Sequence, residues 1–100
     1  MRTIEMLAYS ACDEAKSSKE YAESALEYKI SDPELSRFFY ELANTEHEHG
    51  TKFMNHMDRR INELRNGVNF DDEAEDWFVS KRRNILARLA EAKRYIDMYR

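Results

Sequence analysis

The chain has little of the material from which tight turns and covalent cross-links are made. Its 100 residues include two glycines, one proline and one cysteine. Because glycine and proline dominate tight turns, so few of them favour a small number of long elements. Cys12 is alone, which excludes an internal disulfide and fits a reducing compartment. We expect it to be a small core residue.

Long apolar runs are also missing from the sequence. No stretch approaches the roughly 18 residues of a membrane span, and the first residues lack the apolar segment of a secretion signal. Charged residues make up 36% of the chain with both signs mixed and a net charge of −4, which gives no pull toward nucleic acid. We therefore expect a cytoplasmic protein, or one inside a particle assembled in the cytoplasm such as a virion, with no membrane or nucleic-acid partner.

The spacing of apolar residues predicts one all-α domain over residues 1–100. Side chains recur every three or four residues over about 3–30, 33–65 and 71–99, which is the period of a helix with one apolar face. The first two helices form an antiparallel hairpin because the link between them is short. A third long helix completes the chain. The expected stripes are Ile4, Leu7, Ala8, Ala11, Ala15, Ala22, Ala25 and Leu26; Leu35, Phe39, Leu42, Phe53, Met57, Ile61 and Leu64; and Phe78, Ile85, Leu89, Ala92 and Ile96.

Polar residues mark the places where these helices begin and end. Either Asp32 caps the second helix with Pro33 at its first position, or a capping box spans residues 31–34. Gly67 suits the left-handed conformation that follows many helix ends. Asp72 is expected to cap the third helix.

Two polar residues interrupt the apolar stripe of the second helix. The stripe passes through Glu46 and His49, which lie three residues apart and so share one face, whereas His47 and Glu48 are expected to point outward. On the first helix, Glu14 takes a similar place between small residues. Reflecting the hairpin about its turn puts Glu14 level with His49 and within one turn of Glu46. A buried carboxylate needs a cation, a hydrogen-bond network or a metal, so we predict that these three side chains meet.

The pattern resembles a known protein superfamily. A Glu on one helix and a Glu-x-x-His about 30 residues later on an antiparallel neighbour is similar to half of a ferritin-like di-iron bundle, as in bacterioferritin, rubrerythrin and the encapsulated ferritins. Small ferritin-like proteins of bacterial viruses and prophages are similar over SDPELSRFFYELANTEHEHGTKFMNHM. The resemblance implies that Glu14, Glu46 and His49 are iron ligands.

One chain supplies only half of such a site, because the third helix offers no second Glu-x-x-His. The resemblance therefore implies a four-helix bundle completed by dimerisation, with a di-iron site shared between two subunits that oxidises ferrous iron. Manganese and zinc suit the same ligand types. The alternative hypothesis is a metal-free helical interaction or structural protein of phage origin, either a virion component or a binder of a host factor.

Several other residues are further candidates for the site or for an interface. His56 is a second candidate near the metal site, against a half-buried or capping histidine. Gly50 permits a close helix approach, leaves room for a metal, or is tolerated there by chance, and Glu91 is expected to point away from the site. Lys81 begins a short basic run that predicts no nucleic-acid platform. Remaining apolar residues occupy more than one face and favour an interface with another subunit; they include Phe38, Trp77, Phe78, Tyr95 and Met98.

Overall fold

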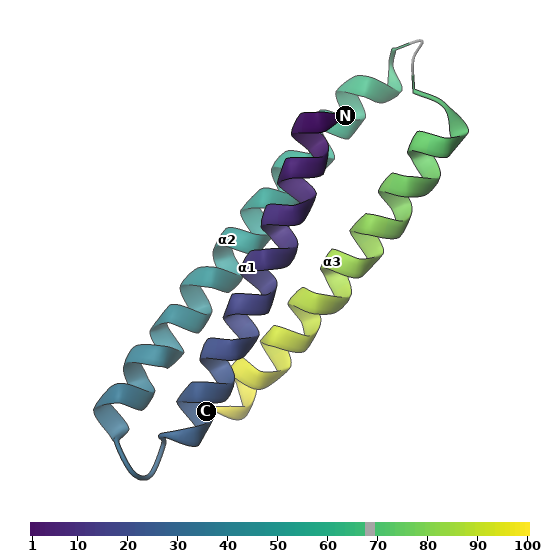
Figure 1. The fold of residues 1–100 in the computed structure, drawn as a ribbon. Coiled ribbons are helices and arrows are strands. Elements are labelled where there is room, and N and C mark those ends of the chain that lie inside the picture. Colours follow the sequence, from purple (N-terminus) through teal and green to yellow (C-terminus); the bar gives the residue numbers. More distant parts are fainter. Residues whose placement is uncertain (68–69) are drawn as a thin grey trace.

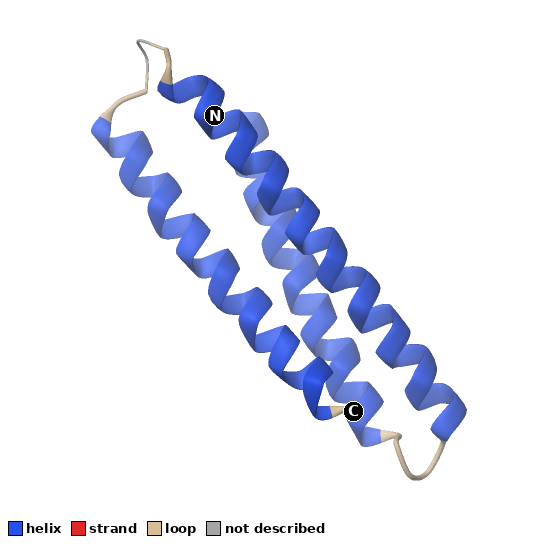
Figure 2. Cartoon of the chain, turned by 180° about the vertical axis from the view of Figure 1, so that it is seen from behind, coloured by secondary structure: helices blue, strands red, loops and turns tan. Residues whose placement is uncertain are grey.

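The computed structural model describes residues 1–67 and 70–100, and every regular element in this part of the chain is a helix (Figures 1 and 2). The helices are α1 (Arg2–Glu27), α2 (Pro33–Arg65) and α3 (Asp72–Met98). They lie along one another in a rod of 57 × 17 × 16 Å. The prediction of three long helices is confirmed, with α1 ending about three residues earlier than expected. No helix among these residues is both long and apolar enough to cross a membrane.

One of the three helix ends marked in the sequence is capped as predicted, at the start of α2. Asp32 accepts a hydrogen bond from the backbone N–H of Leu35 at 3.1 Å, with Pro33 in the first position of α2. Of the two predicted arrangements, the structure therefore has the Asp32 cap. The cap of α3 is Asp71, whose side chain accepts from Ala74 at 2.9 Å, so the prediction of Asp72 was wrong by one residue.

The expected conformation of Gly67 was also wrong. Neither glycine in the chain has a positive φ. Helix α2 ends instead with a tightened last turn, in which the N–H of Gly67 donates to the carbonyl of Leu64 at 2.9 Å. A helix end closed in this way satisfies an orphan carbonyl without a left-handed residue.

The core is built from small residues on α1 and larger ones on α2 and α3. Alanines line the buried side of α1 and let the other two helices approach closely. Two buried serines satisfy their hydroxyls within the hairpin: Ser18 donates to the carbonyl of Ala43 at 2.8 Å, and Ser36 donates to that of Ala25. The larger buried side chains are Ile4, Leu7, Met54, Met57, Ile61, Phe78, Ile85, Leu89 and Ile96.

The buried side of α2 differs from the predicted stripe. Its buried residues are Ser36, Ala43, Gly50, Met54, Met57 and Ile61. Leu35, Phe39, Leu42 and Phe53 are only half-buried, and Leu64 is exposed. Up to Gly50 the helix is turned so that small residues face the other helices and large side chains lie at the edge of the core, whereas from Met54 onward large residues are buried.

Helix α3 packs mainly on α1 and touches α2 less. It also leaves one side of the α1–α2 hairpin uncovered. His47 of α2 bonds to α3. His49 follows two residues later, a rotation of about 200° around the helix axis, so its side chain points roughly 160° away from the direction of His47 and of α3. We call this uncovered side the open face. It is formed by Leu7, Glu14 and Tyr21 of α1 and by Phe39, Glu46, His49, Phe53 and His56 of α2.

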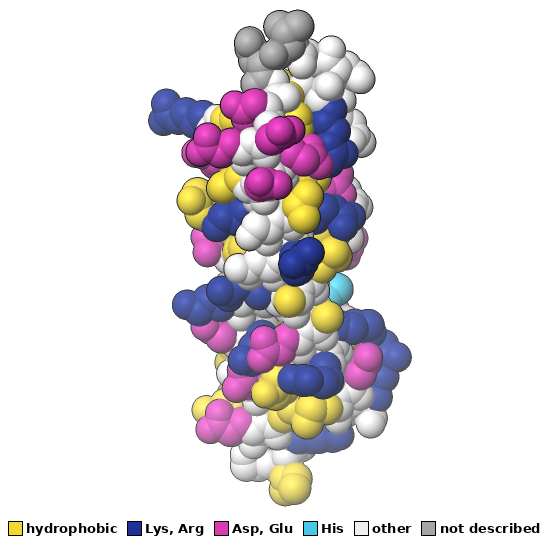
Figure 3. Space-filling model, turned by 90° about the vertical axis from the view of Figure 1, so that its right-hand side faces the viewer, with side chains coloured by type: hydrophobic (Ala, Val, Ile, Leu, Met, Phe, Trp, Pro, Cys, Tyr) yellow, Lys and Arg dark blue, Asp and Glu magenta, His cyan; other side chains and the backbone are white. Residues whose placement is uncertain are grey.

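The α3 side of the rod carries a different surface (Figure 3). Acidic side chains gather near the end where α3 begins, in agreement with the acidic first turn of this helix. Carboxylates near a helix N-terminus are stabilised by the helix dipole. Lys and Arg side chains lie farther along this side, and apolar atoms form small islands between them.

Candidate metal site

The three predicted side chains come together on the open face, about midway along the hairpin. Each of Glu14, Glu46 and His49 offers one ligand atom, and these atoms lie within 4.8 Å of one another. Nδ1 of His49 is 3.6 Å from Oε1 of Glu46 and 3.9 Å from Oε2 of Glu14. Two helices contribute, so the cluster depends on the register of the hairpin and not on local sequence alone. The predicted convergence is confirmed.

The cluster lies at the edge of the core and not inside it. The Glu14 and Glu46 side chains are 25% and 23% exposed, and His49 is 47% exposed. The prediction that these residues face the core of one chain was therefore wrong, because α2 is turned to bury Gly50 and its neighbours. A second molecule or an ion can still reach all three side chains.

Glu14 carries an unsatisfied polar atom. Its Oε2 is buried and finds no hydrogen-bond donor within the described chain, so this carboxyl can hydrogen-bond only when it is protonated and donates to Glu46. The pKa of Glu14 is raised from 4.5 to about 7 by hydrogen bonding with Glu46, by burial and by repulsion from the Glu46 carboxylate, and nearby His49 opposes this shift. Buried polar groups without a partner are rare and costly. The position is one that a cation would stabilise.

The geometry fits a metal ion better than a closed hydrogen-bond network. Nitrogen–oxygen distances of 3.6 and 3.9 Å are too long for hydrogen bonds. Ligand atoms about 2.1 Å from one ion lie roughly 3–3.5 Å apart in tetrahedral or octahedral arrangements, so a small contraction would suffice. Carboxylate and imidazole donors suit iron, manganese and zinc. Three protein ligands also leave open positions on such an ion.

The raised pKa of Glu14 predicts a pH effect on the metal-free protein. The folded state holds this proton more tightly than the unfolded chain, so stability is lost as pH rises from about 4.5 to about 7. Glu14→Gln removes the charge, and we expect the variant to melt above the unsubstituted protein at pH 8 and level with it at pH 4.5. Thermal unfolding in the presence of a chelator measures the melting temperatures of both proteins at the two pH values. An equal difference at the two pH values would contradict the prediction.

His47, predicted to point outward into solvent, contacts α3 instead. Its Nε2 lies 3.0 Å from the carbonyl oxygen of Leu89, and the ring is half-buried. The neighbouring Glu48 behaves as predicted, since it is exposed and pairs with Lys52 at 3.4 Å. No sequence signal distinguishes His47 from an outward residue, because its role depends on where α3 is placed.

Gly50 lies behind the site, where the three helices meet. A Cβ atom there would lie 3.0 Å from Cδ2 of Leu89, 3.5 Å from the carbonyl oxygen of Ala11 and 3.6 Å from the backbone nitrogen of Ala15. Of the three alternatives for this glycine, the structure favours close helix approach. The room that it leaves is taken up by α1 and α3.

His56 lines a groove of about 500 Å³ that begins at the site and also involves Leu7, Lys52 and Phe53. Nη2 of Arg59 lies 2.9 Å from Nδ1 of His56. Arginine can only donate, so Nδ1 accepts and the neutral ring carries its hydrogen on Nε2. In this arrangement His56 is a hydrogen-bond donor, which argues against it as a further metal ligand.

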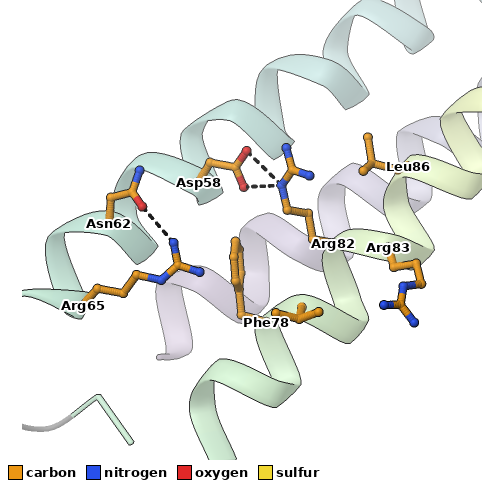
Figure 4. A pocket seen from close by; sticks show the side chains of 8 residues that line it. Asp58, Asn62, Arg65, Phe78, Arg82, Arg83 and Leu86 are labelled. Atoms are coloured by element: carbon orange, nitrogen blue, oxygen red, sulfur yellow. Dashed lines mark hydrogen bonds and ion pairs between the residues drawn. The ribbon is translucent and has the colours of Figure 1, made fainter. Parts of the chain in front are cut away.

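Another groove, of about 520 Å³, lies between α2 and α3 (Figure 4). Three of its four charged side chains are already engaged: Asp58, Arg65 and Arg82. Arg82 pairs with Asp58 at 3.1 Å, and Arg65 pairs with Glu75 while its guanidinium lies 5.1 Å from the centre of the Phe78 ring. These contacts hold α3 to α2, so we assign this groove to packing.

The remaining weak candidates also take part in contacts between helices. Lys81 lies over the ring of Tyr9, which divides the basic run between α1 and α2 and leaves no single basic patch. Glu91 pairs with Lys19 at 2.9 Å on the α1–α3 side, away from the site as predicted. Trp77 and Tyr95 pack partly against the core and are half-buried, so an interface through them stays a prediction.

Comparison with family models, with curated proteins and with solved structures found no match to this chain. The functional argument therefore depends on the geometry of the open face.

Proposed function

We propose that this chain is a ferritin-like metal-binding protein and that Glu14, Glu46 and His49 form half of a two-metal site. The observation that carries the proposal is the buried, partnerless Oε2 of Glu14 at the point where the three ligands converge. The ligands lie on the open face, where a second copy can reach them. The same residues of that copy complete the site.

Stoichiometry supports a shared site. Ferritin-like centres take a Glu from each of two helices and a Glu-x-x-His from each of two others, and one hairpin holds one of each kind. Two hairpins related by a two-fold axis bring four carboxylates and two imidazoles together, and such dimers are the commonest oligomers. Four carboxylates balance the charge of two divalent ions. Iron is the metal we propose, with manganese or zinc as the alternatives.

The residues have distinct roles in this proposal. Glu14 and Glu46 supply negative charge, and Glu14 must give up its proton before it binds, so metal uptake releases protons. His49 supplies a neutral nitrogen donor. Bound iron would bring redox chemistry, and the activity we propose is oxidation of ferrous iron as the substrate, with each ferrous ion giving one electron to an oxidant from solution such as dioxygen. The chain itself supplies charge, fixed geometry and an open coordination position.

Ferrous iron is expected to raise the melting temperature of the metal-free protein. A ligand at a hundred times its dissociation constant stabilises the folded state by about 2.7 kcal/mol. For a domain of this size, each kcal/mol moves the melting temperature by roughly 4–8 °C, so a shift of about 10–20 °C is expected. Scanning calorimetry under anaerobic conditions measures it. An unchanged melting temperature, with only traces of metal retained after desalting, would defeat the proposal.

The open face also favours a second candidate function, a metal-free helical protein that binds another virion or host protein. Half-buried Tyr21, Phe39 and Phe53 are apolar enough to bind a partner without any ion. The calorimetric experiment separates the two functions. A metal-free interaction protein would show no response to ferrous iron, and its Glu14 and Glu46 would serve only packing.

A further inference from the structure

We propose that a second copy of this chain covers the open face in the antiparallel sense, so that the Tyr21–Phe39 pair of each copy packs into the Leu7–Phe53 groove of the other. The inference rests on the proposed function, because the shared site fixes the centre of the interface. It adds the orientation of the partner and the residues that set it.

On each helix of the open face, an apolar or aromatic residue lies at the same distance on either side of the metal-site residue. At seven-residue spacing, the positions are Leu7, Glu14 and Tyr21 on α1, and Phe39, Glu46 and Phe53 on α2. Seven residues are two helical turns, or about 10 Å. The helices run in opposite directions, so Leu7 and Phe53 lie about 10 Å to one side of the site. Tyr21 and Phe39 lie about 10 Å to the other side.

The two ends of the open face have complementary shapes. One end is hollowed by the groove of about 500 Å³ between Leu7 and Phe53. At the other end the rings of Tyr21 and Phe39 stack with their centroids 6.1 Å apart, and Tyr28, just past the end of α1, stacks on Phe39 at 6.0 Å. Large half-buried aromatic rings are the residues that most often anchor an interface.

A two-fold axis can relate two copies here in two ways. An axis perpendicular to the rod exchanges the ends and places the rings of each copy over the groove of the other. An axis parallel to the rod places rings on rings and groove on groove, which leaves the groove unfilled. The perpendicular axis buries apolar surface at both ends, and it keeps Glu14, Glu46 and His49 of both copies at the centre.

The polar atoms at the ends agree with this orientation. His56 lies seven residues beyond His49, on the groove side, and carries its hydrogen on Nε2 because Nδ1 accepts from Arg59. Tyr21 lies seven residues beyond Glu14. The perpendicular axis brings the hydroxyl of the partner subunit's Tyr21 to the level of His56, where it can accept a hydrogen bond. The interface would otherwise bury both groups without partners.

Cross-linking between introduced cysteines tests the orientation. In a Cys12→Ser background, Leu7→Cys and Phe39→Cys lie at opposite ends of one hairpin, about 20 Å apart along the rod by helical rise. A short bis-maleimide cannot bridge them within a chain. In the proposed dimer the two thiols meet across the interface. Their effective concentration becomes millimolar, so at micromolar protein we expect covalent dimer to form roughly a hundredfold faster than with either single cysteine.

Two further variants complete the design. The pair Phe39→Cys with Leu86→Cys is the control, because Leu86 is 41% exposed on α3, outside the open face, and should give no rapid dimer. The pair Tyr21→Cys with Phe53→Cys repeats the test at the other positions if the first pair fails to fold by circular dichroism. Rapid dimer from Phe39→Cys alone would show the parallel axis and overturn the proposal, as would equal rates for test and control pairs.

Running the reaction with chelator or with ferrous iron separates this inference from the proposed function. Rapid cross-linking of the test pair by a protein that binds no metal would defeat the metal site and support this interface. Metal bound by a protein whose test pair reacts no faster than the control would overturn the interface and leave the ligands in place.

Discussion

Replacing Glu46 with alanine is expected to abolish metal binding and, with it, the rise in melting temperature that ferrous iron produces. Glu46 faces both Glu14 and His49, so its loss removes one of three ligands and leaves an incomplete site. Water is uncharged and cannot replace the lost carboxylates of the proposed shared centre, where four carboxylates balance two divalent ions. Calorimetry with and without ferrous iron measures the effect.

Glu48→Ala is the matched control for this substitution. Glu48 lies two residues away on the same helix, is 67% exposed and pairs only with Lys52 at the surface. Exposed ion pairs of this kind contribute little to stability. The control should therefore keep the full response to iron. Equal responses from the two variants would show that Glu46 is not a ligand.

The metal-free forms of the same variants give independent information. Glu46→Ala removes the carboxylate that raises the pKa of Glu14, so Glu14 should ionise more readily and the repulsion between the two side chains should disappear. The variant should be as stable as the unsubstituted protein in chelator, or more so, at pH 8. A large loss of stability under these conditions would indicate a structural role instead.

Gly50→Val is expected to destabilise the fold by about 1–3 kcal/mol while leaving the ligands in place, since overpacking a tight contact has costs of this size. The new Cβ would lie 3.0 Å from a Leu89 methyl group, which can shift, but its two branches would extend toward the backbone of α1, which cannot shift without moving the hairpin. Chemical denaturation measures the loss.

Gly50→Ala provides the comparison for this prediction. Alanine gains about 1 kcal/mol of helix propensity over glycine, which offsets the displacement of the Leu89 side chain, so a nearly neutral result is expected. Because the contact is on the side of α2 that faces α3, both variants should still respond to iron. A valine variant as stable as the alanine variant would contradict the close approach of the helices.

The sequence predicted the helices and the meeting of the three ligands well, for a physical reason. The spacing of apolar residues, the capping residues and the short link after Glu27 are all local signals in the sequence. A tight hairpin then fixes which residues of its two helices lie at the same level along the rod. Reflecting about that turn was therefore enough to bring Glu14 level with Glu46 and His49. No information about α3 was needed.

The rotation of α2 could not be predicted in the same way. Large apolar residues at Phe39, Leu42 and Phe53 indicate a face that requires burial, but they do not say whether the same chain buries it. Helix α3 packs instead against the smaller residues around Gly50, and the bond from His47 to α3 follows from that placement. Because α2 is rotated in this way, half-buried apolar residues surround Glu14, Glu46 and His49 on the open face. A second copy of the chain would complete this arrangement.

Native mass spectrometry of the protein loaded with ferrous or manganous ions tests the shared site most directly, because it counts chains and metal ions in one particle. The account predicts a dimer that carries two metal ions, which disappears in Glu46→Ala and persists in Glu48→Ala. A monomer that binds one ion with the same affinity, or a dimer that takes up no metal, would contradict it.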